Sequence, residues 1–576
     1  MDLVFDIETD DLKATKIHCL VAQDIDSGTI YKYPPDKLQE GYELLSKADK
    51  LIGHNIIGFD IPMVEKFGDV KLSHKPVVDT LVMSRLFNPV REGGHSLEKW
   101  GFRLGFNKID FDDYKNYSKE MLTYCTRDVQ LNTVLFHHLR QEGTGFNKEC
   151  VALEQEVARV IKEQEVNGFK FDIEKAELLL AELRQKMHEA EDEVHKVFKP
   201  KMIDIREVKP KLKKDGTLSK QGLTEEEFNE RLPTNNIKPF MRRKLQDFNL
   251  GSRKQIGEYL IEFGWKPKKF TPTGQPIVDE TTLSNIKNIP QAKLIADYLL
   301  YQKRIAQIDS WIEAVENDGR VHGFVIPNGT ITGRMSHRKP NMAQVPNIHS
   351  PYGSECRSCW TVEDNYNLLG VDASSLELRM LAHYMQDEEF INEIINGDIH
   401  TANQKSAGLE SRDQAKTFIY ALIYGAGDSK LGSVVGGSQA DGKRLREQFF
   451  NNKPSFKSLR DKVQRASGKH WLKGIDGRKL LIRTQHAALN TLLQGGGAIV
   501  MKRGLVMLDA LISLNSLDAR FVGNIHDEWQ IEVREDLSDF VGELAVNCII
   551  KAGEHYNLRC PMDGEYKVGR NWSETH

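Results

Sequence analysis

The chain has 576 residues, with 79 Lys+Arg against 83 Asp+Glu and a formal net charge of −4. This length suits about three to four domains. With 40% hydrophobic and 28% charged residues, the chain can bury cores and is not a disordered polymer. The near-neutral charge excludes a uniformly basic nucleic-acid coat, but local patches still allow nucleic acid as a substrate.

No apolar run approaches the roughly 18–20 residues of a membrane helix, so we expect no membrane span. The start, Met1–Asp6, lacks the basic region of a secretory signal. The seven cysteines are odd in number and scattered, which is not a disulfide framework. Cys356 and Cys359 have no second pair at zinc-ligand spacing, which favours structural cysteines over a metal site. Together these features predict a reduced, cytoplasmic setting.

The elements expected in residues 1–147 alternate between strands and helices. Strands are expected at 3–7, 17–24, 30–33 and 50–53. Helices are expected at 37–48, 61–67, 78–87 and 119–141. The mixture predicts an α/β domain.

Residues 150–198 are predicted to be helical, with a break at Asn167-Gly168. Residues 199–220 carry eight Lys/Arg against three Asp/Glu, together with two prolines and a glycine. That composition predicts a basic, loop-rich insertion. Residues 251–301 return to helices, and Gly-rich turns, strands and further helices follow to the end.

A first group of acids lies in the N-terminal domain. Asp6 and Glu8 end the first predicted strand, where alternation places both on one face. Alone, such a pair is more often an exposed pair at a strand edge. Asp60 follows another strand, however, and Tyr124 and Asp128 share one face of a predicted helix. Four acids and a tyrosine suffice for a two-metal phosphodiesterase, with Tyr124 orienting the attacking water.

The order and spacing of these residues resemble the three motifs of the DnaQ-like 3′→5′ exonucleases. Those enzymes have a ribonuclease-H-like α/β fold. The resemblance therefore implies an exonuclease domain at residues 1–147.

A second group of acids lies in the C-terminal half. Residues 368–374 predict an apolar strand that ends in an acid, Asp372. A helix is expected to follow, with Ser375 as its N-cap. Far downstream, strands at 521–525 and 530–533 flank Asp527 and Glu528, which predicts a hairpin with acids at its tip. An isolated acid at a strand end is more often solvated. Together, these three could hold two metal ions for phosphoryl transfer.

Between these acids lies a predicted helix with a periodic stripe. Arg412, Lys416, Tyr420 and Tyr424 recur every four residues and form one slanting row. Cations can meet phosphates, and rings can stack on a base or sugar. The alternative is an amphipathic core helix, but a core stripe would not begin with Arg and Lys.

These segments resemble the family A DNA polymerases, and in particular the replicative enzymes of T-seven-type bacteriophages. Residues 372–379, 412–425 and 526–528 are similar to motifs A, B and C of the family. Further segments that match the family are 332–334, 340–346, 398–401, 476–478 and 486–494. The likeness extends from Asp6 to Trp572, nearly the whole chain.

The resemblance implies an α/β and α+β multidomain fold. A ribonuclease-H-like 3′→5′ exonuclease domain would be followed by a right-hand polymerase domain with palm, fingers and thumb. The implied boundaries are 1–147 for the exonuclease, 148–310 for a thumb with a basic insertion at 199–247, 311–398 and 475–576 for the palm, and 399–474 for the fingers.

The resemblance also implies template-directed DNA synthesis with proofreading, in the replication of phage DNA. Each active site would use two Mg²⁺ ions, or Mn²⁺ in their place. In the palm, Asp372 and Asp527 would hold them, with the Ala373 carbonyl assisting and Glu528 nearby. In the exonuclease the metal ligands would be Asp6, Glu8, Asp60 and Asp128.

The family likeness gives further residues a role. His400, Arg412 and Lys416 would grip the triphosphate, Tyr420 would lie near the sugar, and Tyr424 would lie near the templating base. A tyrosine at position 420 resembles family members that accept dideoxynucleotides. Glu377 would obstruct a 2′-hydroxyl and so select deoxynucleotides. The expected contacts to DNA, several of them to degenerate minor-groove acceptors, are Arg334, Arg357, Asn490, Gln494 and His526.

The implied partners are dNTPs, a DNA primer–template and a replisome helicase–primase. The protein would be a monomer in the host cytoplasm, with no membrane contact.

Segment 199–247 lies where phage relatives carry a thumb insertion that binds host thioredoxin. Here it is shorter and does not obviously match. Two alternatives stay open: a processivity factor such as thioredoxin and, favoured, a basic loop on duplex phosphates, whose affinity would fall with salt.

Three other functions compete with this one. A single-subunit RNA polymerase shares the Arg/Lys/Tyr helix and the palm acids, but Glu377 and the exonuclease acids argue against it. The others are an exonuclease with an inactive polymerase domain and a non-catalytic nucleic-acid-binding protein. Both complete acid sets argue against these two.

Overall fold

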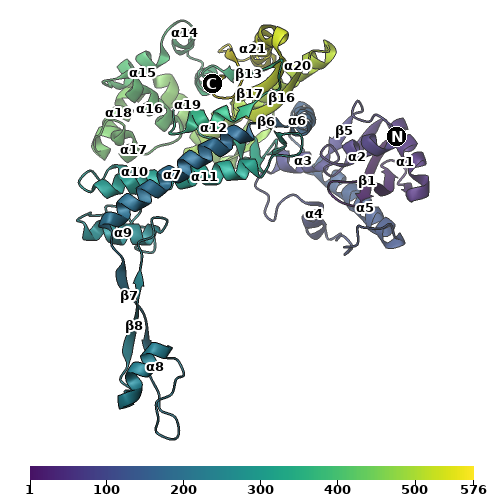
Figure 1. Cartoon of the computed structure of the whole chain (residues 1–576). Coiled ribbons are helices and arrows are strands. Elements are labelled where there is room, and N and C mark those ends of the chain that lie inside the picture. Colours follow the sequence, from purple (N-terminus) through teal and green to yellow (C-terminus); the bar gives the residue numbers. More distant parts are fainter. The chain divides into compact units, whose positions relative to one another are not determined.

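A computed structural model of the protein describes residues 1–576. It contains two compact units, Met1–Asp172 with Ala314–His576, and Ile173–Glu313. Figure 1 shows their helices and strands. None of the helices combines the length and apolar character that crossing a bilayer requires. The seven cysteines are buried and form no disulfide.

A five-stranded sheet opens the first unit, in the order β3-β2-β1-β4-β5. β1 is antiparallel to β2 and parallel to β4. The strands are β1 (Asp2–Thr9), β2 (Ile17–Asp24), β3 (Ile30–Tyr33), β4 (Lys50–Gly53) and β5 (Val77–Asp79). The helices are α1 (Leu38–Lys47), α2 (Asp60–Gly68), α3 (Thr80–Phe87), α4 (Leu97–Leu104) and α5 (Lys119–Glu142). The expected α/β arrangement of residues 1–147 is confirmed.

Helices cover both faces of this sheet, because β1 alternates its side chains between two apolar clusters. Leu3, Phe5 and Ile7 belong to the cluster that contains residues of α1 and α2. Val4 belongs to the other, with residues of α5. Asp6 and Glu8 share the parity of Val4, so both carboxylates lie on the α5 face.

Two details of this region differ from expectation. The helix expected at 78–87 begins only at Thr80, because the β-branched pair before it joins the sheet as β5 and Asp79 caps the helix, accepting from the Leu81 N–H. Helix α4 was not predicted. Its signals are visible in retrospect, since Ser96 caps its start and Gly105 ends it in the left-handed region.

The C-terminal half contains a four-stranded antiparallel sheet, in the order β16-β17-β13-β18. It falls within the segments expected to form the palm. Its strands are β13 (Tyr366–Ala373), β16 (Ala519–Ile525), β17 (Glu528–Arg534) and β18 (Gly564–Gly569), and α20 (Ala488–Leu514) and α21 (Ser538–His555) pack with them. The hairpin expected around residues 526–528 is confirmed as the β16–β17 turn.

Seven helices link β13 to α20, with bounds α13 (Leu376–Met385), α14 (Glu388–Asn396), α15 (Ile399–Ala407), α16 (Arg412–Ile423), α17 (Asp428–Ser433), α18 (Gln439–Asn452) and α19 (Pro454–Ala466). Ser375 occupies the N-cap position of α13 as expected, but it does not cap the helix with its side chain. Ser375 adopts a left-handed backbone with φ 52°, and its side chain makes no capping hydrogen bond. A Cβ at Gly496 of α20 would meet the Met380 methyl at 2.3 Å, so the end of the Met380 side chain would have to shift.

Nine further helices and strands complete the first unit. They are α6 (Lys148–Asn167), β6 (Phe169–Phe171), β9 (Arg320–Val321), β10 (Phe324–Ile326), β11 (Ser336–Arg338), α12 (Gly353–Ser358), β12 (Trp360–Thr361), β14 (Trp471–Lys473) and β15 (Lys479–Leu481). β12, β6 and β9 form one small sheet.

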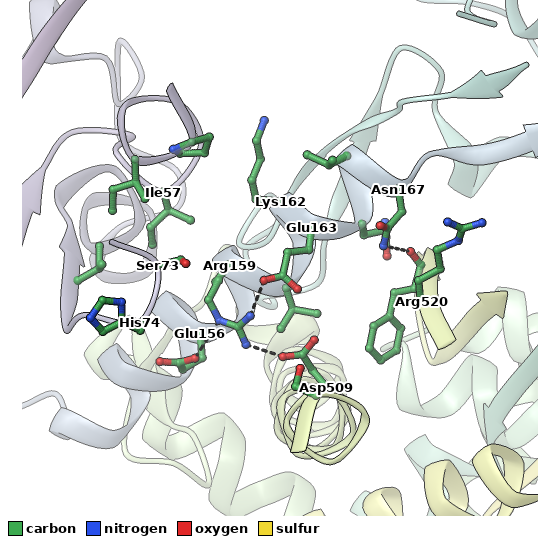
Figure 2. A pocket seen from close by; sticks show the side chains of 18 of the residues that line it. Ile57, Ser73, His74, Glu156, Arg159, Lys162, Glu163, Asn167, Asp509 and Arg520 are labelled. Carbon is green, nitrogen blue, oxygen red and sulfur yellow. Dashed lines mark hydrogen bonds and ion pairs between the residues drawn. The ribbon is translucent and has the colours of Figure 1, made fainter. Parts of the chain in front are cut away.

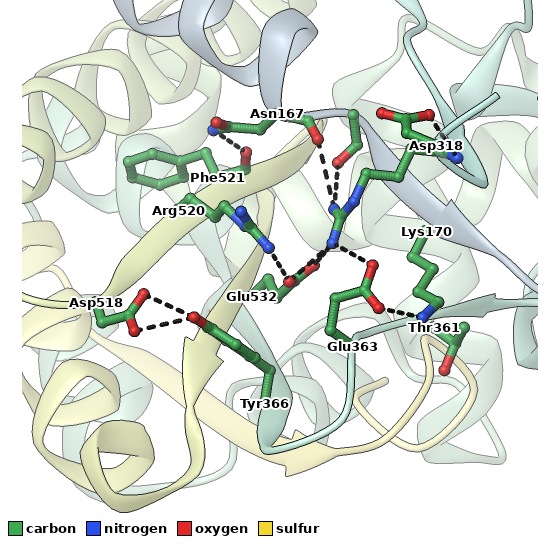
Figure 3. Close-up of polar contacts among 12 residues, drawn as sticks. Asn167, Lys170, Asp318, Thr361, Glu363, Tyr366, Asp518, Arg520, Phe521 and Glu532 are labelled. Atoms are coloured by element: carbon green, nitrogen blue, oxygen red, sulfur yellow. Dashed lines mark hydrogen bonds and ion pairs between the residues drawn. The ribbon is translucent and has the colours of Figure 1, made fainter. Parts of the chain in front are cut away.

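A buried ion-pair network joins that small sheet to the four-stranded one (Figure 3). Arg320 of β9 donates from Nη2 to both carboxylate oxygens of Glu532 at 2.9 Å, and Glu532 of β17 is fully buried. Arg320 also donates to Glu363, which pairs with Lys170 of β6. The two sheets therefore share one set of buried charges.

The second unit consists of paired helices and a long ribbon (Figure 1). α7 (Ile173–Val197) packs against α11 (Pro290–Ile312), and α9 (Arg253–Glu262) and α10 (Glu280–Ser284) add to their apolar core. The ribbon is the antiparallel pair β7 (Lys201–Val208) and β8 (Phe240–Gln246), with α8 (Glu225–Arg231) between them.

The expected loop-rich insertion at 199–220 is therefore partly wrong, because residues 201–208 form a strand. Its side chains, such as Met202 and Ile205, are mostly exposed. Its apolar residues, at 202, 203, 205 and 208, do not alternate strictly with polar ones, so no strand period was visible in the sequence.

Candidate active sites

The first acid cluster lies on the α5 face of the N-terminal sheet. Asp6 and Glu8 project from β1, Asp60 opens α2, and Asp128 is on α5. The Ile7 N–H donates to Asp60 Oδ1 at 3.1 Å, which ties α2 to β1. The predicted acids are thus brought together.

Cys125 of α5 also lies in this cluster. Its thiol donates to Asp6 Oδ2 at 3.6 Å. The side-chain ligand atoms of Cys125, Asp6 and Glu8 lie within 4.8 Å of one another. Cys125 was not among the predicted residues, because a single cysteine carries no pattern.

The carboxylates of the first cluster are buried close together. Burial, and next Asp128, raise the pKa of Asp6 to about 7, and burial followed by Asp6 raises the pKa of Glu8 to about 10. Burial and Asp6 raise the pKa of Asp60 well above its usual value. Each ionised acid is destabilised by its neighbours, as expected where cations are to bind.

The donor set fits a hard divalent ion. Four carboxylates offer oxygen ligands, which Mg²⁺ and Mn²⁺ prefer. In addition, Asp128 is only 4% exposed, and its Oδ1 atom is buried without a hydrogen-bond partner. An unsatisfied buried carboxylate oxygen is costly unless a cation meets it.

Tyr124 lies beside the acids on α5, as its spacing predicted. Its hydroxyl accepts from the Tyr114 hydroxyl at 3.4 Å, and its ring stacks on Phe111 with centroids 5.3 Å apart. Burial and the charge of Asp128 raise the pKa of Tyr124.

Lys108 also reaches this site, with Nζ 2.5 Å from Asp128 Oδ2. Neither Lys108 nor Tyr114 was predicted, because a lysine and a tyrosine in a loop give no periodic signal.

The second acid cluster lies at one end of the four-stranded sheet. Asp372 stands opposite Glu528 across β13 and β17, and Asp527 occupies the turn before β17. The Ala373 N–H donates to the Asp527 carbonyl oxygen at 3.2 Å. All three acids line a cavity of about 310 Å³.

The three acids of this cluster are not equivalent. Burial, then Asp527 and Glu528, raise the pKa of Asp372 to about 7. Burial would also raise the pKa of Glu528, but His576 and other donors lower it overall. The indole N–H of Trp572 donates to Glu528 Oε1 at 2.6 Å, and His576 Nδ1 lies 3.2 Å from Glu528 Oε2. His576 and Trp572 were missed as site residues, since no spacing links them to the motifs.

The predicted stripe follows one face of α16. Arg412 and Lys416 are exposed, Tyr420 is half-buried, and Tyr424 is the C-cap residue. The opposite face, including Phe418 and Ile419, is buried in the core. The helix is therefore amphipathic, but the stripe lies on its open side.

His400 on α15 lies beside these two cations. Its pKa is lowered by burial and then by Arg412 and Lys416, so all three lie near one another. Asp398 caps α15 and accepts from Arg412 Nε at 2.7 Å, which joins the starts of α15 and α16.

Glu377 of α13 connects the stripe to the second acid cluster. It accepts from the Tyr424 hydroxyl at 2.9 Å and from Arg334 Nη2 at 3.1 Å. Burial, then Glu377 and Asp527, raise the pKa of Tyr420 to about 12, which places Tyr420 near both acids.

The residues predicted to contact DNA occupy different environments. Asn490 and Gln494 lie in the first turns of α20, and His526 is exposed in the β16–β17 turn. Arg357 is buried at 6% exposure, where it donates to the Pro346 carbonyl at 3.0 Å and lies over Trp572. It lines the cavity of the second acid cluster.

A larger cavity, of about 670 Å³, lies away from both clusters (Figure 2). Arg159 crosses it, pairing with Glu163 at 2.6 Å and with Asp509 at 2.5 Å. None of the predicted site residues lines it. Three of the acids that line it, Glu156, Glu163 and Asp509, pair with this one arginine.

Comparison with known proteins identifies the family. Residues 221–574 match DNA polymerase family A. The chain is 34% identical to the DNA-directed DNA polymerase of Enterobacteria phage T3 and 33% identical to that of Escherichia phage T7. Both alignments span 703 residues and cover 100% of both chains.

The fold is also that of a solved polymerase. The POL domain of Pol1 from M. smegmatis, in complex with DNA primer-template and dNTP, superposes with a TM-score of 0.81 at 20% identity. The match covers 100% of this chain and 96% of that one. The chain therefore belongs to DNA polymerase family A and is a DNA-directed DNA polymerase similar to those of phages. The expected family and polymerase fold are confirmed.

Proposed function

We propose that this DNA polymerase replicates phage DNA on a primed template and proofreads with a separate 3′→5′ exonuclease site. The observation that carries the proposal is the presence of two buried carboxylate clusters on two different sheets. Only the second faces a helix with a cationic and aromatic stripe. One cluster thus suits nucleotide addition, and the other suits hydrolysis of a phosphodiester.

At the second cluster, Asp372, Asp527 and the Ala373 carbonyl would hold two Mg²⁺ ions, or Mn²⁺. Such ions activate the primer 3′-hydroxyl and neutralise the triphosphate and the departing pyrophosphate. Glu528 is already engaged by Trp572 and His576, so its part is to shape the cavity. Catalysis here rests mostly on positioning and charge.

The α16 face would receive the incoming nucleotide. Arg412, Lys416 and His400 bind its triphosphate. Tyr420 packs near the sugar, where its hydroxyl can replace a missing 3′-hydroxyl contact in a dideoxynucleotide. Glu377 lies beneath and obstructs a 2′-hydroxyl.

The primer–template would lie across α20 and the β16–β17 turn. Asn490, Gln494, His526 and Arg334 would contact it, several through minor-groove acceptors that do not distinguish base pairs. Arg357 acts from behind the cavity, because its guanidinium is buried. These contacts suit geometry checking that is independent of sequence.

At the first cluster, Asp6, Glu8, Asp60 and Asp128 would hold the ions for hydrolysis. Tyr124 orients the attacking water. The hydroxyl–hydroxyl contact with Tyr114 fixes the position of the Tyr124 oxygen. The strongly raised pKa values of Asp6 and Glu8 fit a site that is completed by cations.

The domain assignment follows the same reasoning. The N-terminal sheet region would be the exonuclease, the four-stranded sheet with α20 and α21 would belong to the palm, and α15–α19 would form the fingers. The unit Ile173–Glu313 is the thumb. Its β7–β8 ribbon would contact duplex phosphates directly, and a processivity factor is the alternative occupant. The protein would act as a monomer with a helicase–primase in the host cytoplasm.

Primer extension tests the polymerase proposal. On a primed DNA template the protein should incorporate dNTPs in preference to rNTPs, and a preference for rNTPs would contradict the polymerase proposal.

Repeating the assay with and without host thioredoxin across a salt titration separates the two roles proposed for the β7–β8 ribbon. Direct phosphate contact predicts a steep loss with salt and no thioredoxin effect.

A further inference from the structure

A fixed loop covers the first acid cluster. Residues 105–117, between α4 and α5, contain no helix or strand. Arg127 of α5 donates from Nε to the Asn107 carbonyl at 2.8 Å, and its guanidinium lies 3.5 Å from the Phe106 ring centre. Further along, Tyr114 contacts Tyr124. The loop is thus held at both ends against the helix that carries Asp128.

The loop presents one cation to the acids. Lys108 Nζ lies 2.5 Å from Asp128 Oδ2 and 4.7 Å from the centre of the Tyr124 ring. Its charge also lowers the pKa values of Asp6 and Glu8 against the effect of burial. The ammonium therefore lies within the field of three carboxylates. Its side chain is 23% exposed, so it is not sealed in the interior.

The contacts of Lys108 leave donors available. An ammonium has three N–H donors and no acceptor, and one donor suffices for Asp128 Oδ2. A phosphodiester bound at these acids would bring charged non-bridging oxygens close to Nζ. Charge-assisted hydrogen bonds to such oxygens are among the stronger polar contacts, and they strengthen as charge develops in the reaction.

We propose that Lys108 binds the 3′-terminal phosphodiester of single-stranded DNA while it stays paired with Asp128. This inference rests on the proposed exonuclease function of the first cluster. The competing role is that of a counter-ion that only neutralises Asp128. The two roles differ in what they predict for binding of DNA without metal.

Binding in EDTA is the direct test. The full-length protein is titrated calorimetrically with a dT trinucleotide, and Lys108→Met is compared with Lys115→Met, an exposed lysine of the same loop. We expect Lys108→Met to weaken binding about 10-fold or more, Lys108→Arg to recover part of the loss, and Lys115→Met to bind as the wild type. Unchanged binding by Lys108→Met would overturn the proposal.

A second set of measurements separates phosphate binding from support of the fold. With Mg²⁺, Lys108→Met should remove 3′-nucleotides from single-stranded DNA about 10²–10³-fold more slowly in single turnover. Its melting temperature and primer extension should not change, and its Mn²⁺ binding should not weaken, because a competing positive charge is removed from the site. A drop in melting temperature that accompanies the slower shortening of DNA would overturn the proposal in favour of the counter-ion. A wild-type protein that does not shorten single-stranded DNA would refute the exonuclease itself, whereas failure of Lys108 alone leaves that activity intact.

Discussion

The two carboxylates on the facing strands β13 and β17, Asp372 and Glu528, differ in what occupies their oxygens. Trp572 and His576 take both oxygens of Glu528. Asp372 has no such partners, and its pKa is raised to about 7 by burial and the neighbouring acids. A carboxylate crowded by other acids is free to bind a cation, whereas one already satisfied by donors is not.

Amide substitutions should therefore separate these two acids. Asp372→Asn removes a carboxylate that we propose as a metal ligand, and we expect primer extension to slow about 10²–10³-fold or more. Glu528→Gln keeps the size of the side chain and should cost only about 10-fold, through weaker packing of His576. Single-turnover extension at saturating Mg²⁺ measures both. Equal losses would show that Glu528 is itself a metal ligand.

Sugar selection should depend on the bulk of Glu377 rather than on its charge. Glu377→Ala opens space beside the bound sugar and frees Tyr424 and Arg334. The preference for dNTPs over rNTPs should fall about 10- to 100-fold, measured as the ratio of kcat/KM values. The matched variant Glu377→Gln should keep most of the preference, and a comparable loss there would contradict the steric account.

His337 on β11 should make stability fall in mild acid. It is 6% exposed, and burial followed by the charge of His526 lowers its pKa to about 4. Below about pH 6.5 the unfolded chain takes up a proton at this histidine while the folded chain does not. The native state should thus lose about 1.4 kcal/mol per pH unit until about pH 4.

Denaturant unfolding at pH 7 and pH 5 tests this sign. Between these two pH values, the free energy of unfolding of the wild type should fall by about 2 kcal/mol more than that of His337→Gln, because the glutamine cannot titrate. A larger loss in His337→Gln would mean that the histidine is charged in the folded protein.

At the scale of elements, the network around Arg320 and Glu532 holds two sheets together. Arg320→Met leaves the fully buried Glu532 with Arg520 as its remaining partner. Breaking such a pair from one side costs about 3–5 kcal/mol. The exposed pair Arg534–Asp536 is the matched control, because solvent screens it and Arg534→Met should change the free energy of unfolding far less. Similar losses in both variants, measured by denaturant unfolding, would refute the account.

The elements that sequence reasoning located best were those with a strong period. β1 and β4 alternate or run apolar between turn signals, and α5 and α16 keep a helical stripe over several turns. The positions of the acids on these elements followed directly from strand and helix geometry.

What sequence reasoning missed depends on contacts between distant segments. β7 is a strand only because β8, more than thirty residues further along the chain, pairs with it. Likewise Lys108, His576 and Asp398 join their sites through single contacts from loops or termini. No local period encodes such contacts, so only the folded chain reveals them.

At the scale of the whole molecule, the near-neutral charge conceals an uneven distribution. The two acid clusters concentrate negative charge where cations are expected, and the α16 face and residues 199–220 concentrate positive charge. In the proposed function, these two clusters act as two separate centres of phosphoryl chemistry on two sheets. The central claim is that these centres act independently on the same DNA end.

The fate of a 3′-mismatched primer tests that claim most directly. With Mg²⁺ and dNTPs, the wild type should remove the mismatch and then extend the primer. Asp6→Ala with Glu8→Ala should leave the mismatch in place but extend a matched primer normally, whereas Asp372→Ala with Asp527→Ala should only shorten either primer. If either double variant lost both activities while its melting temperature stayed unchanged, the account of two independent centres would be wrong.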